Sequence, residues 1–245
     1  MNYRQKTAHQ IKEHQRLANV ARRFSTDIGF NSTLIELRYR TLRKYFRGET
    51  CLELGSSDGK GTQHLLDYFD RVVAVDGSRK FTEDLKGRFP SKNLEVIRSL
   101  FEEYQTTEKF DVIVLAHVLE HVKHPVAVLR CAKRWLKRSG VLLVDVPNAN
   151  SIHRLVGVKM GLLKSITSLN EGDIRIGHRR VYTISALEQD IQTAGLRVKK
   201  IGGVFLKPVS NTQIEKTWSP EMVEGFYELG QDIPELASEI YAVCT

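Results

Sequence analysis

A glycine-rich stretch and a carboxylate further along the chain stand out by their residue types and spacing. The stretch CLELGSSDGKG joins an apolar run to a turn in which Gly55, Gly59 and Gly61 let the backbone approach a ligand closely. Asp76 lies 23 positions after Glu53, close to the spacing at which a carboxylate after a second parallel strand binds ribose hydroxyls. The alternatives are a tight strand-to-helix connection for the glycines and an exposed turn carboxylate for Asp76.

Three histidines lie where they could exchange a proton with a ligand. His117 and His121 are four residues apart after an apolar run, so a helix that starts there would carry both on one face. His178 follows Gly177 in a polar segment further along. Histidine is the usual general base near neutral pH. A structural hydrogen bond or a contact at a helix start is the alternative for each of the three.

Alternating strand and helix patterns predict the elements that position these residues. Apolar runs predict parallel strands over 51–54, 71–76, 94–99, 110–116 and 141–146, and two further strands over 196–206 and 240–243. The intervening helical patterns are typical of a parallel sheet covered on both faces. Ligands bind at the carboxyl ends of such strands, so we expect the glycine-rich turn and Asp76 to meet there.

Local signals predict several helix ends. The helical pattern over 122–136 is followed by Lys-Arg-Ser-Gly at 137–140, which indicates a cationic last turn and a glycine stop. Ser185 and Glu188 have the spacing of a helix cap. The helical pattern toward the end of the chain is expected to break near Gly230.

Two segments outside the sheet are expected to flank the ligand. Residues 1–48 read as a helical lid or flank beside a main domain over 49–245, with a break over 24–30. The second helix of this flank is expected to begin with a cap at Asn31, Ser32 or Thr33 and to dock through an apolar stripe formed by Ile35, Tyr39, Leu42 and Phe46. Residues 148–182, after the fifth strand, are expected to cover the substrate.

The positive charge is concentrated at the start of the chain. Residues 1–48 hold eleven Lys or Arg against three Asp or Glu, a balance of +8 that equals the formal charge of all 245 residues. Such a segment could meet a nucleic acid or a nucleotide-linked small molecule, and two helices with solvated basic faces are the alternative.

Cysteine usage and hydropathy bear on the compartment. The three cysteines are scattered, with no CxxC pair and no Cys/His cluster at metal spacing, so we expect a reducing compartment and no metal. No signal-peptide core and no run long enough to span a membrane is present. A cytoplasmic protein is expected.

The distributed motifs resemble those of the class I S-adenosylmethionine-dependent methyltransferases, from about Gly48 onward. ELGSSDG is similar to the acidic-x-Gly-x-Gly-x-Gly motif of that family, and VAVD to its second strand with the ribose carboxylate. FDVI and HVLEH look like the fourth-strand motif, and residues 136–146 like the glycine-then-strand motif that follows. Ser57 departs from the pattern, because the middle glycine is expected there.

The resemblance implies a fold, a cofactor and a reaction. The fold is α/β, a Rossmann-like, seven-stranded and mostly parallel sheet with helices on both faces. The cofactor is S-adenosylmethionine, whose methyl group an acceptor oxygen or nitrogen takes by in-line displacement while the protein supplies alignment and a dry site. A hydroxyl acceptor also needs its proton removed, so His117, His121 and His178 are the catalytic candidates.

The resemblance also implies which residues contact each ligand. The cofactor-binding candidates are Glu53, Gly55, Ser57, Gly59, Asp76, Gly77, Ser78, Phe101, Ala116 and His117. The acceptor-binding candidates are Asn148, Asn150, Arg179, Arg180 and Tyr182. For Phe101 a place in the core is the alternative, and for the two arginines solvated loop charges are the alternative.

Three functions follow from these observations. Looser likeness to bacterial enzymes of quinone, sugar and secondary-metabolite synthesis favours methyl transfer to a small, anionic or nucleotide-linked metabolite. The basic residues 1–48 raise an RNA methyltransferase as an alternative. Against it, the fourth strand leads into Ala-His-Val-Leu, without the Asn/Asp-Pro-Pro-aromatic turn used on base amines, and aromatic residues are not interleaved with the basic ones. A cofactor-binding protein without transfer activity is the third possibility.

Overall fold

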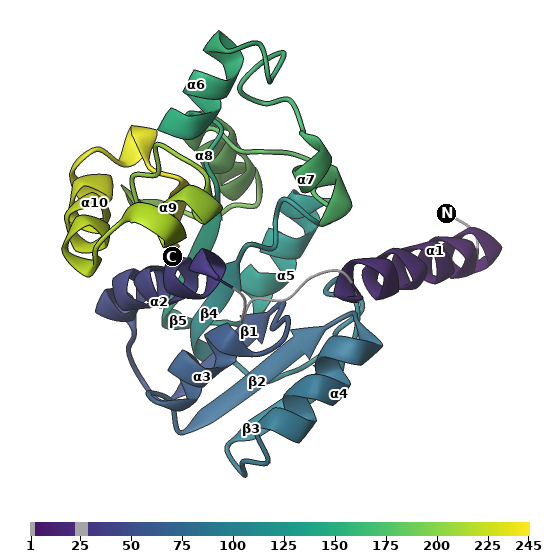
Figure 1. The fold of residues 1–245 in the computed structure, drawn as a ribbon. Coiled ribbons are helices and arrows are strands. Elements are labelled where there is room, and N and C mark those ends of the chain that lie inside the picture. The colour runs from purple at the N-terminus through teal and green to yellow at the C-terminus, as the bar shows by residue number, and fades with distance from the viewer. Residues whose placement is uncertain (1–2, 23–28) are drawn as a thin grey trace.

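A seven-stranded sheet forms the centre of the molecule (Figure 1), and the expected α/β fold is confirmed. The computed structural model describes residues 3–22 and 29–245, with side chains described from residue 11 onward. The strands are β1 Thr50–Leu54, β2 Arg71–Asp76, β3 Leu94–Arg98, β4 Phe110–Ala116, β5 Leu136–Pro147, β6 Val198–Gly203 and β7 Glu239–Cys244. All seven strand predictions are therefore confirmed, with shifted ends in β5 and β6.

The strand order places a ligand crevice at the middle of the sheet. The order is β3-β2-β1-β4-β5-β7-β6, in which β1 to β5 are parallel and β7 runs antiparallel to both β5 and β6. The order reverses between β1 and β4, and the loops after these two strands diverge to opposite faces of the sheet. In open α/β sheets this switch point is where ligands bind.

Helices cover both faces of the sheet. They are α1 Tyr3–Ala21, α2 Phe30–Leu42, η1 Arg43–Tyr45, α3 Lys60–Leu66, α4 Arg79–Arg88, α5 Pro125–Trp135, α6 Ile152–Lys159, α7 Glu171–Arg175, α8 Ile184–Thr193, α9 Asn211–Thr217, α10 Pro220–Asp232 and η2 Pro234–Leu236. One apolar core lies between the sheet and α5 with α8. A second core lies on the other face, where α2, α3, α9 and α10 pack.

Helix α2 belongs to the main body of the protein. The predicted stripe is confirmed, since Ile35, Tyr39, Leu42 and Phe46 are all buried in the core under α2. The predicted cap is wrong, because α2 already begins at Phe30 with no side-chain cap. Most of the predicted break over 24–30 lies outside the described residues.

Helix α1 lies beside α4 at the edge of the body (Figure 1). It starts at Tyr3 and ends at Ala21, within the segment expected to be helical. In the described part of the chain, no helix combines the length and the apolar character that crossing a membrane requires.

Three local predictions are corrected by the structure. Residues 137–140 are not the last turn of a helix, because α5 ends at Trp135 and β5 starts at Leu136, which pairs with Phe110 ahead of a bulge. Thr183, and not Ser185, caps α8 by accepting a hydrogen bond from the Ala186 N–H.

The expected break near Gly230 is also absent, since α10 continues to Asp232. A Cβ at Gly230 would lie 2.6 Å from the Leu206 nitrogen, so this glycine allows close backbone packing within a regular helix.

The segment after β5 forms a loop that is closed at its base. It carries α6 and α7, and Figure 1 shows α6 at the tip of the molecule. Its two ends are tied together, because the Ala149 N–H donates to the Tyr182 carbonyl at 2.7 Å and the Tyr182 N–H donates to the Pro147 carbonyl at 3.3 Å. We call residues 148–182 the cover.

Candidate active site

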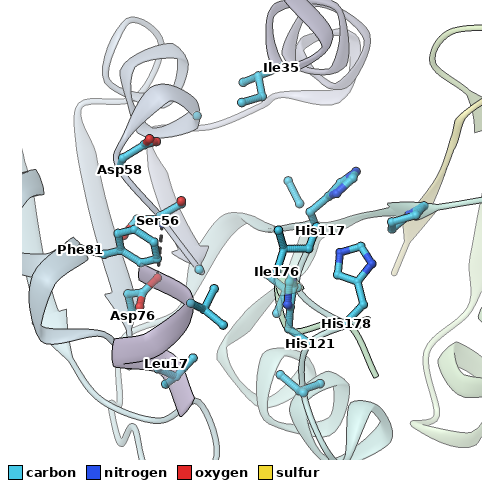
Figure 2. Close-up of a pocket in the computed structure, with 18 of the residues that line it drawn as sticks. Leu17, Ile35, Ser56, Asp58, Asp76, Phe81, His117, His121, Ile176 and His178 are labelled. Atoms are coloured by element: carbon cyan, nitrogen blue, oxygen red, sulfur yellow. Dashed lines mark hydrogen bonds between the residues drawn. The ribbon is translucent and has the colours of Figure 1, made fainter. Parts of the chain in front are cut away.

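A cavity of about 900 Å³ lies at the carboxyl ends of the parallel strands. Its wall combines residues from the loops after β1, β2, β3, β4 and β5 with residues of α1, α2 and the cover. Figure 2 shows Ser56, Asp76 and Phe81 on one side and His117, His121 and His178 on the other. We call these the carboxylate side and the histidine side.

The loop after β1 turns through unusual backbone conformations. Gly55 has a φ of 86° and Ser57, a residue with a side chain, has a φ of 50°. A Cβ at position 55 would lie 2.7 Å from Val118 Cγ2, so only glycine fits between β1 and the loop after β4. The irregular position in the motif therefore keeps the left-handed backbone that glycine usually supplies.

Asp76 holds the end of this loop in place. Its carboxylate accepts hydrogen bonds from the N–H groups of Ser57 and Ser78, at 3.3 and 2.7 Å, and it is only 7% exposed. Burial raises the pKa of Asp76 to about 6, while these backbone donors oppose the rise. Each oxygen retains lone pairs that can accept from ligand hydroxyls at the cavity wall.

Glu53 connects the strand end to two helices. It is buried and accepts from the Tyr39 hydroxyl of α2 at 3.2 Å and the Thr62 hydroxyl of α3 at 2.6 Å. Burial raises its pKa to about 7, against the effect of these two donors. Gly61 makes this contact possible, because a Cβ there would lie 2.3 Å from the Tyr39 oxygen.

The carboxylate side fits an adenosine linked to an amino acid. The hydroxyls of Ser56 and Ser57 are buried without hydrogen-bond partners, and both residues line the cavity beside Asp76. Unpaired buried hydroxyls are costly, so a polar ligand there would satisfy them. Glu53, Ser56, Ser57 and Asp76 would hold S-adenosylmethionine, with Phe81 and Phe101 as the apolar wall.

Most of the predicted cofactor residues meet at the cavity. Those that line it are Glu53, Gly55, Ser57, Asp76, Gly77, Phe101, Ala116 and His117. Gly59 and Ser78 do not. Gly59 begins α3 in a left-handed conformation, and the Ser78 hydroxyl accepts from the Phe81 N–H to cap α4. Both therefore act on the loop and helix that carry the neighbouring lining residues.

On the histidine side, His117 lies in a buried group of charges. With a φ of 55°, it places Nδ1 3.2 Å from Glu120 and Nε2 3.2 Å from both Asp145 and Glu239. Arg38 of α2 pairs with the same Asp145 at 2.9 Å and Glu239 at 2.6 Å.

These neighbours decide the charge of His117. Burial and Arg38 oppose protonation, but Glu239, Glu120 and Asp145 outweigh them and raise the pKa of His117 to about 9. An imidazolium at neutral pH donates hydrogen bonds and does not accept a proton, so the base role predicted for His117 does not fit this environment.

His121 and His178 stack edge to face, with ring centroids 4.7 Å apart. Burial and the neighbouring histidines hold the pKa of His121 well below its usual range, so that ring is neutral. His178 Nδ1 lies 3.5 Å from Asp173, which can orient the ring, and Nε2 lies 4.0 Å from Glu120.

Two groups on this side have the donor atoms that a metal ion would need. Glu120, His121 and His178 bring their ligand atoms within 4.8 Å of one another, as do His117, Asp145 and Glu239. Arg38 already provides the positive charge in the second group. The spacing along the sequence did not reveal either group, because each combines distant segments.

The structure separates the predicted acceptor residues from the cavity, with one exception. Asn148 lines it, but its amide donates to the carbonyls of Glu235 and Ala237. Asn150, Arg179, Arg180 and Tyr182 are not among the lining residues.

The four residues outside the lining have structural partners. The Asn150 N–H donates to the Asn148 side chain, and the Tyr182 hydroxyl donates to Asp190 at 2.9 Å. Arg180 donates to the carbonyls of Leu119 and Val122. These groups fix the cover and the loop after β4, so direct contact with an acceptor is not supported for them.

Helix α1 joins the two sides of the cavity. His14 Nδ1 lies 3.2 Å from the Gly77 carbonyl, and a Cβ at Gly77 would lie 2.5 Å from Leu17 Cδ1. Arg16 donates to the Gly177 carbonyl at 3.1 Å, and Arg179 of the cover pairs with Glu13 at 2.8 Å. Arg179 thus binds α1 instead of a ligand.

Sequence reasoning missed Arg38, Asp145 and Glu239, although two of them carried a signal. Asp145 interrupts an apolar strand, and Arg38 lies on the apolar stripe of α2. Buried charges in such positions indicate a partner. No such signal marked three other residues that line the cavity, Lys207, His153 and Arg154.

The comparisons with known proteins agree with this geometry. A family model described as a methyltransferase domain matches residues 28–201, well over half of the chain. Cypemycin N-terminal methyltransferase of a Streptomyces species is 27% identical over 163 residues, covering 65% of this chain and 60% of that protein. Ubiquinone biosynthesis O-methyltransferase of Aeromonas salmonicida is 27% identical over 171 residues, covering 67% and 69% respectively.

Coverage of the relatives is partial. The match spans 28% of the length of the first curated relative, (S)-coclaurine N-methyltransferase of Thalictrum flavum, and 60% of the next two. Among solved structures, N-methyltransferase NodS of Bradyrhizobium japonicum, bound to S-adenosylhomocysteine, has a TM-score of 0.59 at 15% identity and covers 96% of each chain. From the family match, the sheet order and the cavity at its switch point, the chain belongs to the class I S-adenosylmethionine-dependent methyltransferases.

Proposed function

We propose that this protein transfers the methyl group of S-adenosylmethionine to an oxygen or nitrogen of a small metabolite that is anionic or nucleotide-linked. The observation that carries the proposal is the two-sided cavity, in which the Asp76 loop faces a wall of neutral and charged histidines. The likeness to ubiquinone biosynthesis O-methyltransferase supports a small-molecule acceptor. A single cavity holding both partners gives the proximity that methyl transfer needs.

The carboxylate side is proposed to bind the cofactor. Asp76 accepts from the ribose hydroxyls, and the hydroxyls of Ser56 and Ser57 contact the polar part of the ligand. Helix α1 acts as a lid within the flank over residues 1–48, since it already bonds the Gly77 carbonyl and the cover. Closing it would exclude water and strengthen each of these polar contacts.

The histidine side is proposed to prepare the acceptor. The bound cofactor supplies an activated methyl group, so the protein has to align the acceptor and remove its proton. His178 is the proposed base, because it lines the cavity and Asp173 lies 3.5 Å from Nδ1 to orient the ring. The neutral His121 beside it keeps a second cation away from that proton transfer.

Transfer of a labelled methyl group from the cofactor to pools of hydroxy acids, amines and sugar nucleotides tests the proposal. We expect labelled product from an anionic pool. His178→Ala is expected to lower kcat about 100-fold or more and to leave the binding of S-adenosylhomocysteine unchanged.

Asp76→Asn is expected to weaken the binding of S-adenosylhomocysteine about 10-fold or more, while Asp84→Asn, in an exposed pair on α4, leaves it unchanged. Cofactor binding without any labelled product would contradict transfer activity.

A further inference from the structure

Lys207 is a cation at the cavity wall without a carboxylate partner. It follows β6, lines the cavity, and donates a hydrogen bond to the neutral amide oxygen of Asn211 at 3.1 Å. Among the described residues, no Asp or Glu oxygen lies within 4.0 Å of its ammonium group. Burial lowers the pKa of Lys207, and the charges of Glu239 and Asp173 oppose this shift only in part.

The two carboxylates whose charges act on Lys207 are bound to other cations. Asp173 pairs with Arg154 at 3.2 Å and also accepts from the Asn170 N–H, at the start of α7. Glu239 pairs with Arg38 at 2.6 Å and lies 3.2 Å from His117. Both acidic groups therefore have partners already, which leaves Lys207 as a surplus cation at this wall.

His153 supplies an independent observation at the same place. Its ring lines the cavity, and its Nδ1 is buried without a hydrogen-bond partner. Burial and the cations Lys207 and Arg154 lower its pKa to about 3. At His153 the two cations therefore outweigh the carboxylate of Asp173, and a polar atom of a ligand could bond the unpaired Nδ1.

Asn211 adds a fixed support for Lys207. Its amide nitrogen donates to the Asn31 side chain of α2 at 2.7 Å while its oxygen accepts from Lys207. The same side chain thus ties the lysine to two helices on one side of the cavity, which reduces the entropy lost when a ligand binds.

We propose that Lys207, supported by Asn211 and next to His153, binds an anionic oxygen group of the acceptor, a carboxylate or a phosphate. This inference rests on the proposed function, because it places the acceptor in the same cavity as the cofactor. A half-buried cation without a carboxylate partner is costly, and an anion of the ligand would offset that cost. Holding the acceptor at this end would fix its orientation toward His178.

Calorimetric titration of the full chain, saturated with S-adenosylhomocysteine, tests this site with sodium phosphate and sodium benzoate as separate probes. We expect saturable binding of one or both, and the stronger probe identifies the anionic group. Lys207→Met is expected to weaken that binding at least 10-fold, whereas Lys164→Met, at an exposed lysine of the cover, changes it less than 2-fold. Binding of neither probe, or equal binding by Lys207→Met, would overturn the proposal.

Two further measurements separate the possible failures. Lys207→Met is expected to bind S-adenosylhomocysteine as wild type does and to melt no lower, since a surplus charge is removed. Wild type, but not Lys207→Met, should melt at a higher temperature when the bound anion is added. Failure of the wild type to bind S-adenosylhomocysteine would count against the proposed function, while normal cofactor binding without anion binding would count against this site alone.

Discussion

Ser57 occupies a left-handed backbone conformation in the loop on the carboxylate side of the cavity. A residue with a Cβ pays roughly 1–2 kcal/mol for this conformation, whereas glycine adopts it freely. The buried Ser57 hydroxyl has no hydrogen-bond partner among the described residues, so a ligand that bonds it would offset this cost. Serine at this position therefore lowers the stability of the loop and offers a ligand a hydroxyl group.

Replacing Ser57 with glycine is expected to raise the stability of the protein and to weaken cofactor binding. Ser57→Gly is expected to stabilise the ligand-free protein by up to about 1 kcal/mol, because the strain is removed but the unfolded chain gains freedom. It is also expected to bind S-adenosylhomocysteine more weakly. Thermal melts and calorimetry of Ser57→Gly check both, with Gly87→Ala on the outer face of α4 as a control for glycine effects. Lower stability together with tighter binding would contradict this account.

His117 couples stability to pH. Its folded pKa of about 9 is above its ordinary value of 6.5, so its contribution to stability is complete below pH 6.5 and is lost as the pH rises through 9. We expect the free energy of unfolding to fall by on the order of 2 kcal/mol between pH 7 and 9.5.

Urea titrations of the wild type and His117→Asn check this dependence. The variant should be less stable at pH 6.5, and the two curves should converge above pH 9. Parallel curves for the two proteins over that window would show that another group is responsible.

At the level of elements, α1 connects the glycine-rich half of the site to the cover. Glu13 contacts Arg16 on its own helix and Arg179 of the cover, and Arg16 donates to two carbonyls across the cavity. These polar contacts hold α1 against the cover and the loop after β4. Its opening should therefore depend on single polar side chains.

Glu13→Gln is expected to release α1 and to increase the dissociation rate of S-adenosylhomocysteine by roughly 5-fold, the equivalent of about 1 kcal/mol for a partly buried ion pair. Stopped-flow displacement measures the rate. Glu83→Gln, in an exposed pair on α4, should leave the rate unchanged. An unchanged rate in Glu13→Gln would show that α1 does not limit release.

The elements were largely predictable from the sequence, because each depends on local pattern. The apolar runs located all seven strands, and the loop after β1 and Asp76 could be placed because they follow strands directly. The start of β5 was not predictable, since residues 137–140 read as a helix stop and become a strand only by pairing with β4. The prediction of acceptor-binding residues was wrong for a related reason. Arg179 and Arg180 follow the cavity-lining His178 in the sequence, but their side chains bind backbone carbonyls and α1.

At the scale of the whole molecule, Arg38 joins three elements that are far apart in the sequence. It comes from α2 and pairs with Asp145 of β5 and Glu239 of β7, all three buried. No spacing rule brings these residues together, and only the position of β7 beside β5 does so. This group, and with it the charge of His117, could not be predicted from local sequence.

Arg38→Met is expected to destabilise the protein by roughly 3–5 kcal/mol, because it leaves Asp145 and Glu239 buried with too little positive charge. Arg40→Met, on the same helix, removes an exposed pair with Glu224 and a contact over Tyr227, and should cost no more than about 1.5 kcal/mol. Urea unfolding of both variants measures the difference. Equal losses in the two variants would contradict a special role for Arg38.

The position of β7 has a consequence for how the protein is made. β7 lies between β5 and β6 in the sheet, although it follows β6 in the chain. During synthesis β1 to β5 can associate as they leave the ribosome. β6 pairs only with β7, so it has no strand partner until β7 has also emerged. The acidic partner that β7 supplies to Arg38 also arrives at that moment. Until then the nascent chain exposes an open edge at β5, where non-native strand pairing can occur.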